Sequence, residues 1–210
     1  MKIATVGDNC IDLYNSMGHA YPGGNPVNVA VYFTRLGGEA SYTGVVGDDE
    51  YGKLMINALK KKNIDISNVK VLPGKTAITH VELVEGDRVF GDYEAGVMAK
   101  FKLTDEDVDF LTKHDIVVSG LWGMIEDDIY KIKEKETLIA FDFATKLNDP
   151  IVEKAIYYVD YAFFSYEEDN DFVRNYMKEM HKKGPKLVIV TLGEKGSLCY
   201  DGTRFTKYGI

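Results

Sequence analysis

The sequence predicts an α/β domain in which helices cover both faces of a mostly parallel sheet, with a small antiparallel flap attached. Short apolar runs, typical of buried strands, alternate along the chain with stretches of helical periodicity. This alternation is interrupted at residues 10–21 and again at residues 76–93, where the pattern is that of a hairpin without a following helix. The 210 residues are enough for one domain with its own core.

Each element of the α/β body follows from a local pattern. Strands are expected at the apolar runs 3–6, 42–46, 116–119, 138–141, 161–164 and 187–191. Helices are expected at 27–36, 51–62 and near 105–113, 125–135, 150–158 and 169–183. Gly37-Gly38 ends the first helix, and the second has a basic last turn that suits the helix dipole.

The flap is predicted from TAITHVELVEGDRVFGDY, in which two alternating runs meet at Glu85-Gly86-Asp87. Apolar residues fall on both predicted faces: Ile78 and Val84 on one, Val81 and Leu83 on the other. Exposed strand edges and apolar faces need cover. We therefore expect the flap to be either a lid over a ligand or the contact surface of a homodimer.

Composition and charge exclude several classes of protein. The net charge is −8, and the basic residues are interspersed with acidic ones, which argues against a nucleic-acid or anionic-membrane partner. No apolar run approaches the ~18 residues of a membrane span. Cys10 and Cys199 lie far apart in strand-like segments, which is typical of a reduced, cytoplasmic protein. The histidines show no zinc-ligand spacing.

The segment PGGNPVNVAV, residues 22–31, opens the first helix in an unusual way. Asn25 fits an N-cap and Pro26 the first helical position, so Asn28 falls at the third position on the same end of the helix. Gly23 and Gly24 allow a ligand to approach the backbone closely. Free N–H groups and two amides suit a polyhydroxylated ligand. The alternative is an ordinary capped helix after a tight turn.

The pattern continues through residue 52 as GGNPVNVAVYFTRLGGEASYTGVVGDDEYG, and it resembles the N-terminal signature of the ribokinase/PfkB family of carbohydrate kinases. The resemblance extends along the whole chain, from IATVGD to VIVTLGEKG. It implies a ribokinase-like three-layer α/β/α sandwich over residues 1–210, a single domain with an antiparallel β lid formed by about 10–21 and 76–93. It also implies phosphorylation of a sugar hydroxyl with ATP and Mg²⁺.

The resemblance also implies a substrate site. Asp12, in NCIDLY, matches the family aspartate that contacts sugar hydroxyls, with Gly23, Gly24, Asn25 and Asn28 beside it. Taken alone, Asp12 fits a turn or cap equally well.

Residues 76–101 resemble the branch of the family that acts on glycated amino acids, which implies fructoselysine as the substrate. The lysine part of fructoselysine carries an ammonium and a carboxylate, for which Glu94 and Arg88 are candidate partners. The alternative is that these two are solvated hairpin charges.

The nucleotide site is expected around LVIVTLGEKGSLCY, which is not a Walker A loop and by itself reads as a turn between strands. The resemblance assigns ATP binding to Thr191, Gly193, Gly196, Lys146, Ser165 and Glu168. Ser165 stands where the family has asparagine, which departs from its Asn-x-x-Glu motif. Lys146 fits a solvated lysine equally well. No protein metal ligand is assigned, since Mg²⁺ held by ATP phosphates and water needs few.

The family's second signature, Gly-Ala-Gly-Asp, is not found in the sequence, although the family places its catalytic base there. We therefore expect the base to lie beyond Ile210 and the domain to be incomplete at its C-terminal side. Alternative functions are a fructokinase or other small-sugar kinase, a non-catalytic sugar- or nucleotide-binding protein, and an interaction module that dimerises through the flap.

Overall fold

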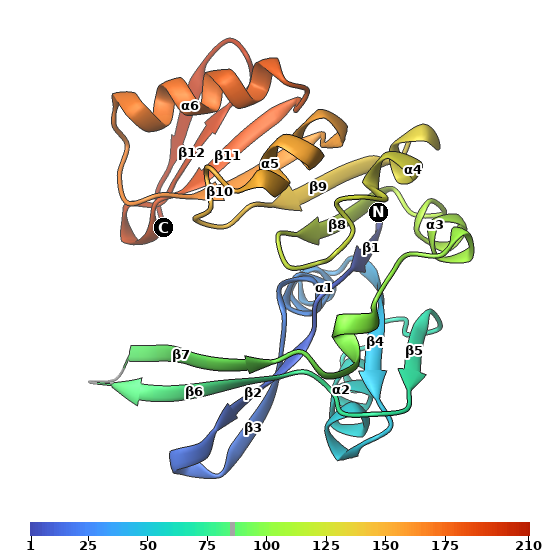
Figure 1. The fold of residues 1–210 in the computed structure, drawn as a ribbon. Helices are drawn as coiled ribbons and strands as arrows, with labels where there is room; N and C mark the ends of the chain where they lie inside the picture. Colours follow the sequence, from blue (N-terminus) through green and yellow to red (C-terminus); the bar gives the residue numbers. More distant parts are fainter. Residues whose placement is uncertain (85–86) are drawn as a thin grey trace.

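The computed structural model describes residues 1–84 and 87–210 and contains a nine-stranded and a four-stranded sheet (Figure 1). In spatial order the large sheet consists of β13 (Phe205–Tyr208), β12 (Ser197–Tyr200), β11 (Leu187–Thr191), β10 (Tyr161–Ser165), β9 (Leu138–Asp142), β8 (Ile116–Gly120), β1 (Lys2–Val6), β4 (Glu39–Gly47) and β5 (Val69–Leu72). The strands from β11 to β5 are parallel, and β12 and β13 add an antiparallel edge. The mostly parallel sheet is confirmed.

Helices follow the strands in the predicted alternation. They are α1 (Asn25–Arg35), α2 (Glu50–Lys61), α3 (Asp105–Leu111), α4 (Ile129–Glu134), α5 (Pro150–Ala155) and α6 (Asp171–Lys182). Short 3₁₀ turns are η1 (Asn15–Met17), η2 (Gly96–Lys100), η3 (Ile156–Tyr158) and η4 (Gly193–Lys195). Side chains cap several of these helices: Asp49 accepts from the Gly52 N–H, and Asn170 from the Val173 N–H.

Two apolar clusters hold the sheet and helices together. The larger joins one sheet face to α3, α4, α5 and α6, through residues such as Phe141 and Phe164. The smaller packs α1 and α2 on the opposite face, over β1 and β4, through residues such as Tyr42 and Met55. Helices therefore lie on both faces, but within the part of the chain that the structure describes no helix covers the second face at β9, β10 and β11.

The predicted flap is a four-stranded sheet with the order β3 (His19–Gly23), β2 (Cys10–Tyr14), β6 (Ile78–Val84) and β7 (Asp87–Glu94), and it extends away from the body (Figure 1). A turn is predicted at Glu85-Gly86-Asp87, and its first two residues, 85–86, lie outside the described residues. The predicted two-faced pattern is wrong in one respect. Ile78 and Val81 are both buried, because the register shifts between Thr79 and Val81, whereas Leu83 and Val84 are both exposed.

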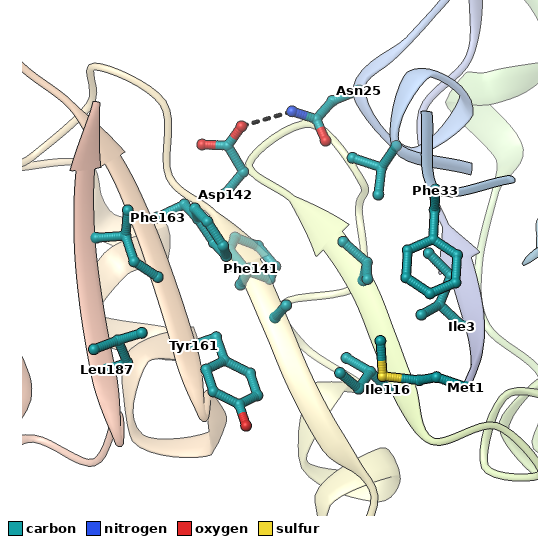
Figure 2. Close-up of a pocket in the computed structure, with 14 residues that line it drawn as sticks. Met1, Ile3, Asn25, Phe33, Ile116, Phe141, Asp142, Tyr161, Phe163 and Leu187 are labelled. Carbon is teal, nitrogen blue, oxygen red and sulfur yellow. Dashed lines mark hydrogen bonds between the residues drawn. The ribbon is translucent and has the colours of Figure 1, made fainter. Parts of the chain in front are cut away.

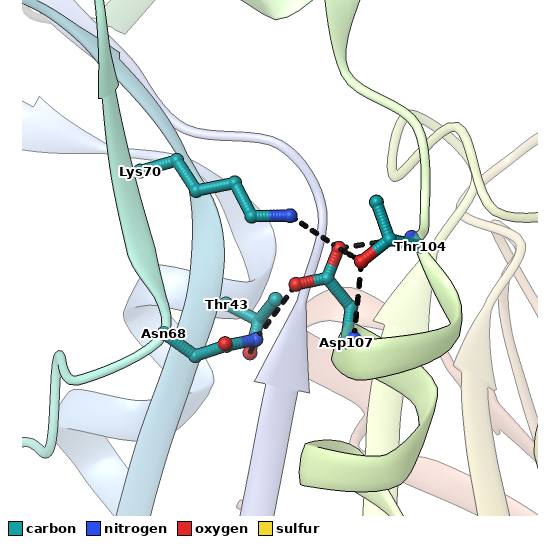
Figure 3. A network of polar contacts seen from close by, with 5 residues as sticks. All are labelled: Thr43, Asn68, Lys70, Thr104 and Asp107. Atoms are coloured by element: carbon teal, nitrogen blue, oxygen red, sulfur yellow. Dashed lines mark hydrogen bonds and ion pairs between the residues drawn. The ribbon is translucent and has the colours of Figure 1, made fainter.

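A buried carboxylate connects the β4–β5 side of the sheet to α3 (Figure 3). Asp107 accepts hydrogen bonds from Lys70 Nζ at 2.6 Å, Asn68 Nδ2 at 3.0 Å and the Thr104 backbone N–H at 2.9 Å. Burial alone would raise the pKa of Asp107, but the bonds from Lys70 and Thr104 outweigh it, so the pKa lies below its ordinary value. The charged form of Asp107 is therefore part of the folded structure.

Among residues 1–84 and 87–210, every helix is too short or too polar to cross a membrane.

Candidate active site

The candidate site lies where the carboxyl ends of the parallel strands meet the start of α1. Asn25, the first residue of α1, donates its side-chain amide to Asp142 Oδ2 at 2.6 Å (Figure 2). Its backbone N–H donates to Asp8 Oδ2 at 3.1 Å. Asp142 ends β9, and Asp8 follows β1. In open α/β sheets, ligands bind at this carboxyl edge.

The predicted helix cap at Asn25 is wrong. Gly24 is the N-cap residue, and no side chain accepts a hydrogen bond there. The amide of Asn25 is directed toward β9, because Asp142 offers it a charged acceptor, which is stronger than a backbone contact. Asn25 therefore joins the helix to the sheet edge.

Two buried side-chain oxygens at the start of α1 are hydrogen-bond acceptors without a donor in the described part of the chain. Asp8 Oδ1 and Asn25 Oδ1 are buried and have no hydrogen-bond partner within the described part of the chain. Burial raises the pKa of Asp8, and the nearby charge of Asp142 acts in the same direction. Buried oxygens without partners are unfavourable by themselves. They suit a ligand that brings hydroxyl or ammonium donors.

The turn that holds Asp142 is itself strained. Asp142 Oδ1 accepts the backbone N–H of Ala144 at 2.8 Å, and Ala144 has a φ of 50°. Left-handed backbone at a residue other than glycine is unfavourable and often marks a functional site.

The lid contributes a row of side chains that share one face. In the strand register, Asp12 lies opposite both Tyr21 and Thr79, and Thr79 lies opposite Tyr93. Burial raises the pKa of Asp12, while the charge of Arg88 acts in the opposite direction. Burial also raises the pKa of Tyr93 to about 12, with further contributions from Cys10 and Asp8. Tyr93 therefore lies on the lid face that carries Asp12 and close to Asp8 at the sheet edge.

Gly23 and Gly24 occupy positions where a side chain would clash. A Cβ at Gly23 would lie 2.8 Å from Asp12 Oδ2, and one at Gly24 would lie 2.7 Å from the Asp8 carbonyl oxygen. Gly24 also has a φ of 107°. The two glycines thus allow the lid and the start of α1 to approach Asp8 and Asp12.

Asn25 and Asn28 both lie in the first turn of α1, but they line different hollows. Asn28 is exposed and lines a second groove of about 260 Å³ between β3, α1 and α2, together with Tyr32 and Lys62. The helix begins at Asn25, one residue before the predicted first helical position at Pro26, so Asn28 stands at its fourth position.

The two charged residues predicted in the flap are both on β7. Glu94 contacts His80 Nε2 at 3.1 Å, and His80 Nδ1 lies 2.9 Å from the Asn15 amide. Arg88 is exposed, stacks over the Phe90 ring at 6.0 Å and is near enough to Asp12 to affect its pKa.

The predicted nucleotide residues gather at the carboxyl ends of β10 and β11. Ser165 Oγ and Thr191 Oγ1 are hydrogen-bonded at 2.8 Å across the two strands. Gly193 and Gly196 both have positive φ in the turn after β11, and a side chain at Gly196 would overlap the Tyr208 carbonyl. Glu168 follows β10 and accepts from the Asn170 amide at 3.3 Å. Lys146 is exposed in the loop after β9, apart from these contacts.

Sequence reasoning missed Asp8, Asp142 and Tyr93. For the two aspartates a signal was present, because each comes directly at the end of an apolar strand run. Tyr93 could be placed only with the lid register. Among the described residues, the candidate site included, no three His, Cys, Asp or Glu side chains are grouped so as to hold a metal ion.

A mostly parallel sheet with acidic and amide groups at its carboxyl edge, and a four-stranded mixed lid beside it, is the architecture of the ribokinase-like fold. The chain belongs to the PfkB family: the family model described as pfkB family carbohydrate kinase matches residues 5–208. The predicted family and fold are confirmed.

Two curated relatives are similar over nearly the whole chain. Fructoselysine 6-kinase of Escherichia coli K12 is 44% identical over 98% of this chain and 78% of its own length. Fructosamine kinase FrlD of Bacillus subtilis is 34% identical over 97% of this chain and 73% of its own length.

Solved structures share the fold. Ribokinase of Arabidopsis thaliana, complexed with ribose and ATP, superposes with a TM-score of 0.86 at 19% identity, covering 100% of this chain and 78% of that one. A putative ribokinase II of E. coli, in complex with ATP and Mg²⁺, gives 0.83 at 20% identity, covering 99% and 78%.

Proposed function

We propose that this carbohydrate kinase transfers the γ-phosphoryl group of ATP to the terminal hydroxyl of fructoselysine. The observation that carries the proposal is the 44% identity to fructoselysine 6-kinase over 98% of the chain. The second relative, named a fructosamine kinase, supports the same substrate class.

In this proposal the sugar part lies between the lid and the sheet edge. Asp12 binds sugar hydroxyls, and the Asp8 and Asn25 oxygens without partners accept further donors. Phosphoryl transfer depends mainly on positioning the hydroxyl in line with the phosphate and on stabilising charge. Buried acceptors held by hydrogen bonds to α1 and β9 provide such positioning.

The lysine part of the substrate extends along β7. Glu94 faces its ammonium group, and Arg88 its carboxylate. Both side chains are exposed enough to meet a ligand, and the contact with His80 limits the motion of Glu94. A small sugar such as fructose has no groups for these two residues.

ATP binds at the carboxyl ends of β10 and β11, at Ser165, Thr191, Gly193 and Gly196. Proteins of similar fold have been solved in complex with ATP, which supports ATP as the phosphoryl donor. Glu168 supplies one carboxylate, which fits Mg²⁺ because that ion keeps several waters and phosphate oxygens as ligands. Bound Mg²⁺ would neutralise phosphate charge. Lys146, in the loop after β9, is the remaining candidate for binding the nucleotide.

The lid also presents apolar surface. Leu83, Val84, Val89 and Phe90 are each about half exposed or more on the outer hairpin. We infer from this that the lid is the contact of a homodimer, for which light scattering at increasing protein concentration is the test. A Phe90→Glu variant is expected to remain monomeric.

Both cysteines are free, which supports a cytoplasmic location.

Calorimetry with fructoselysine, fructose and ribose tests the substrate. We expect fructoselysine to bind at least tenfold more tightly than the other two. A coupled assay for ADP, with the chain extended by the unmatched segment of the E. coli relative, then tests turnover. Rapid turnover of fructose or ribose without turnover of fructoselysine would contradict the substrate and leave the kinase class intact.

A further inference from the structure

Trp122, the only tryptophan of the sequence, lies in the loop that follows β8 at the carboxyl edge of the sheet. It is 56% exposed, although Leu121 before it and Gly123 after it are buried. Met124 is exposed as well and has a φ of 56°, a left-handed conformation that is uncommon for a residue with a side chain. The loop therefore presents two large apolar side chains to solvent and contains unfavourable backbone, which often marks a functional site.

The backbone on each side of Trp122 is fixed against the candidate active site. The residue before it donates its N–H to the carbonyl oxygen of Asp142 at 2.8 Å. The residue after it, Gly123, packs so closely on Gly7 that a Cβ at Gly7 would lie 2.5 Å from Gly123 Cα. Gly7 directly precedes Asp8, and β8 itself packs beside α1 (Figure 1). The indole is therefore attached between the segments that carry Asp8 and Asp142.

The chemistry around this loop favours a cation. Asp8, Asp12 and Asp142 place three carboxylates in the candidate site, and Asp8 Oδ1 is buried without a donor in the described part of the chain. An indole face attracts cations more strongly than the other aromatic rings do, and the attraction increases when the pair is removed from water. A ligand group that combines a cation with methylene groups would therefore suit both the carboxylates and the ring.

The proposed substrate contains such a group. In fructoselysine the sugar is joined to the lysine side chain through a secondary amine, which as an alkyl amine is protonated at neutral pH, and a chain of methylene groups follows it. Fructose has a neutral hydroxyl at the same carbon. The linking amine is close to the sugar ring, whereas the groups assigned to Arg88 and Glu94 are at the far end of the lysine part.

We propose that Trp122 is a specificity-determining residue whose indole ring packs against the secondary ammonium and the adjoining methylene groups of a glycated amine. The ammonium donates a hydrogen bond to Asp8 Oδ1, and the ring covers it from water. This role rests on the proposed function, because it places the sugar between the lid and the sheet edge. It extends recognition to glycated amines other than fructoselysine, since the linkage is common to all of them.

Calorimetry on the 210-residue chain tests the role with four ligands: fructoselysine, fructose, the butylamine adduct of fructose, and the butyl ether of fructose at the same carbon. The adduct retains the linking ammonium but has no groups for Arg88 or Glu94, and the ether retains the chain without the cation. Trp122→Leu keeps an apolar side chain and removes the ring. It is expected to weaken binding of fructoselysine and the adduct about tenfold and to leave fructose and the ether within about twofold. Trp122→Phe is expected to retain an intermediate affinity.

Fluorescence of the unmodified chain tests the contact without a substitution. Because Trp122 is the only tryptophan, the indole emission of the 210-residue chain comes from this ring alone. Saturation with the butylamine adduct is expected to shift the emission to shorter wavelengths and to reduce quenching by acrylamide, with the same midpoint that calorimetry gives. An emission that does not change while the adduct binds would overturn the contact, whatever the affinity of the variants.

Tyr157→Leu is the matched control. Tyr157 is 55% exposed in η3, which precedes β10 and so lies at the opposite, amino edge of the sheet. Its substitution is expected to leave all four affinities unchanged. Circular dichroism and thermal unfolding establish that each variant is folded.

The possible failures are distinguishable. If Trp122→Leu weakens fructose and the adduct equally, the ring packs on the sugar itself, which overturns the inference and leaves the proposed function intact. If it weakens the ether as much as the adduct, recognition of the cation is overturned. If the unmodified chain binds fructose but neither fructoselysine nor the adduct, the proposed substrate and the role of Trp122 both fail.

Discussion

The side chain of Asn25 is joined to Asp142 by a 2.6 Å hydrogen bond that spans 117 residues of sequence. Through this bond the first residue of α1 is attached to the last residue of β9. The lid strand β3 leads directly into α1, so the bond also determines where the lid connects to the sheet edge. The candidate active site depends on this contact more than on any local motif.

Substituting Asp142 by alanine is expected to lower the free energy of unfolding by about 1–3 kcal/mol, the usual range for losing a hydrogen bond to a charged group. Because the start of α1 would lose its attachment, sugar binding measured by calorimetry is expected to weaken at least tenfold. Asp127→Ala is the control, since that carboxylate is 75% exposed in a surface ion pair. Equal effects from both variants would contradict a special role for the Asn25–Asp142 contact.

Asp8→Asn is expected to separate stability from function. An acid whose pKa is raised by folding destabilises the folded state at any pH above its unfolded pKa, so removing the charge of Asp8 is expected to raise the melting temperature at neutral pH. Asparagine retains an oxygen for the Asn25 N–H. Sugar binding is expected to weaken because the charged acceptor is lost. Unchanged sugar binding would remove Asp8 from the site.

The pH dependence of stability provides a test of Asp107. Its pKa is lowered on folding, so the stability it contributes is present above the unfolded pKa of about 3.9 and is lost as the pH falls through the lower folded pKa. Asp107→Asn is therefore expected to lower stability at pH 7 and to flatten its loss below pH ~4. Urea unfolding at several pH values measures this slope. Asp109→Asn, with a 65% exposed side chain, is expected to leave the slope unchanged.

Much of the fold could be predicted because buried strands have continuous apolar runs, as at residues 187–191, where the predicted strand and β11 coincide. Strands β5 and β13 were missed because they are short and partly exposed, so their patterns are mixed. Within the candidate site, Gly23 and Gly24 were predicted from the local motif PGGNPVNVAV, and Asp12 from the family resemblance of NCIDLY. The contacts of Asn25 with Asp8 and Asp142 could not be predicted from the sequence, because they join the ends of separate strands through tertiary packing.

Gly24→Ala is expected to destabilise the protein by about 1–3 kcal/mol, the range for strained backbone, and more if the clash with Asp8 is not relieved. Gly18 also has a positive φ, of 65°, but a Cβ there would meet nothing within 4 Å. Gly18→Ala therefore measures the backbone effect alone, about 1–2 kcal/mol. Thermal unfolding of the two variants tests the difference, and a smaller loss for Gly24→Ala would contradict the close approach at Asp8.

Arg88→Ala is expected to distinguish the proposed substrate from a smaller sugar. The guanidinium is exposed on β7 and influences Asp12, so it stands beside the sugar site without being buried in it. If it pairs with the carboxylate of fructoselysine, its removal weakens fructoselysine binding about tenfold, equivalent to ~1.4 kcal/mol, and leaves fructose binding unchanged. Raising the salt concentration is expected to reproduce part of this loss in the unmodified protein, since an exposed pair is screened.

Arg204→Ala is the control for Arg88, because Arg204 is exposed near the β12–β13 edge and, among the described residues, forms an ion pair with Asp201 alone. Calorimetry with both ligands on both variants gives four comparisons. A parallel loss of fructose and fructoselysine binding in Arg88→Ala would mean that Arg88 acts through Asp12 on the sugar itself. Unchanged binding of both ligands would mean that Arg88 is a solvated hairpin charge, the alternative that the sequence also allowed. Specificity for the lysine part would then have to come from Glu94 alone.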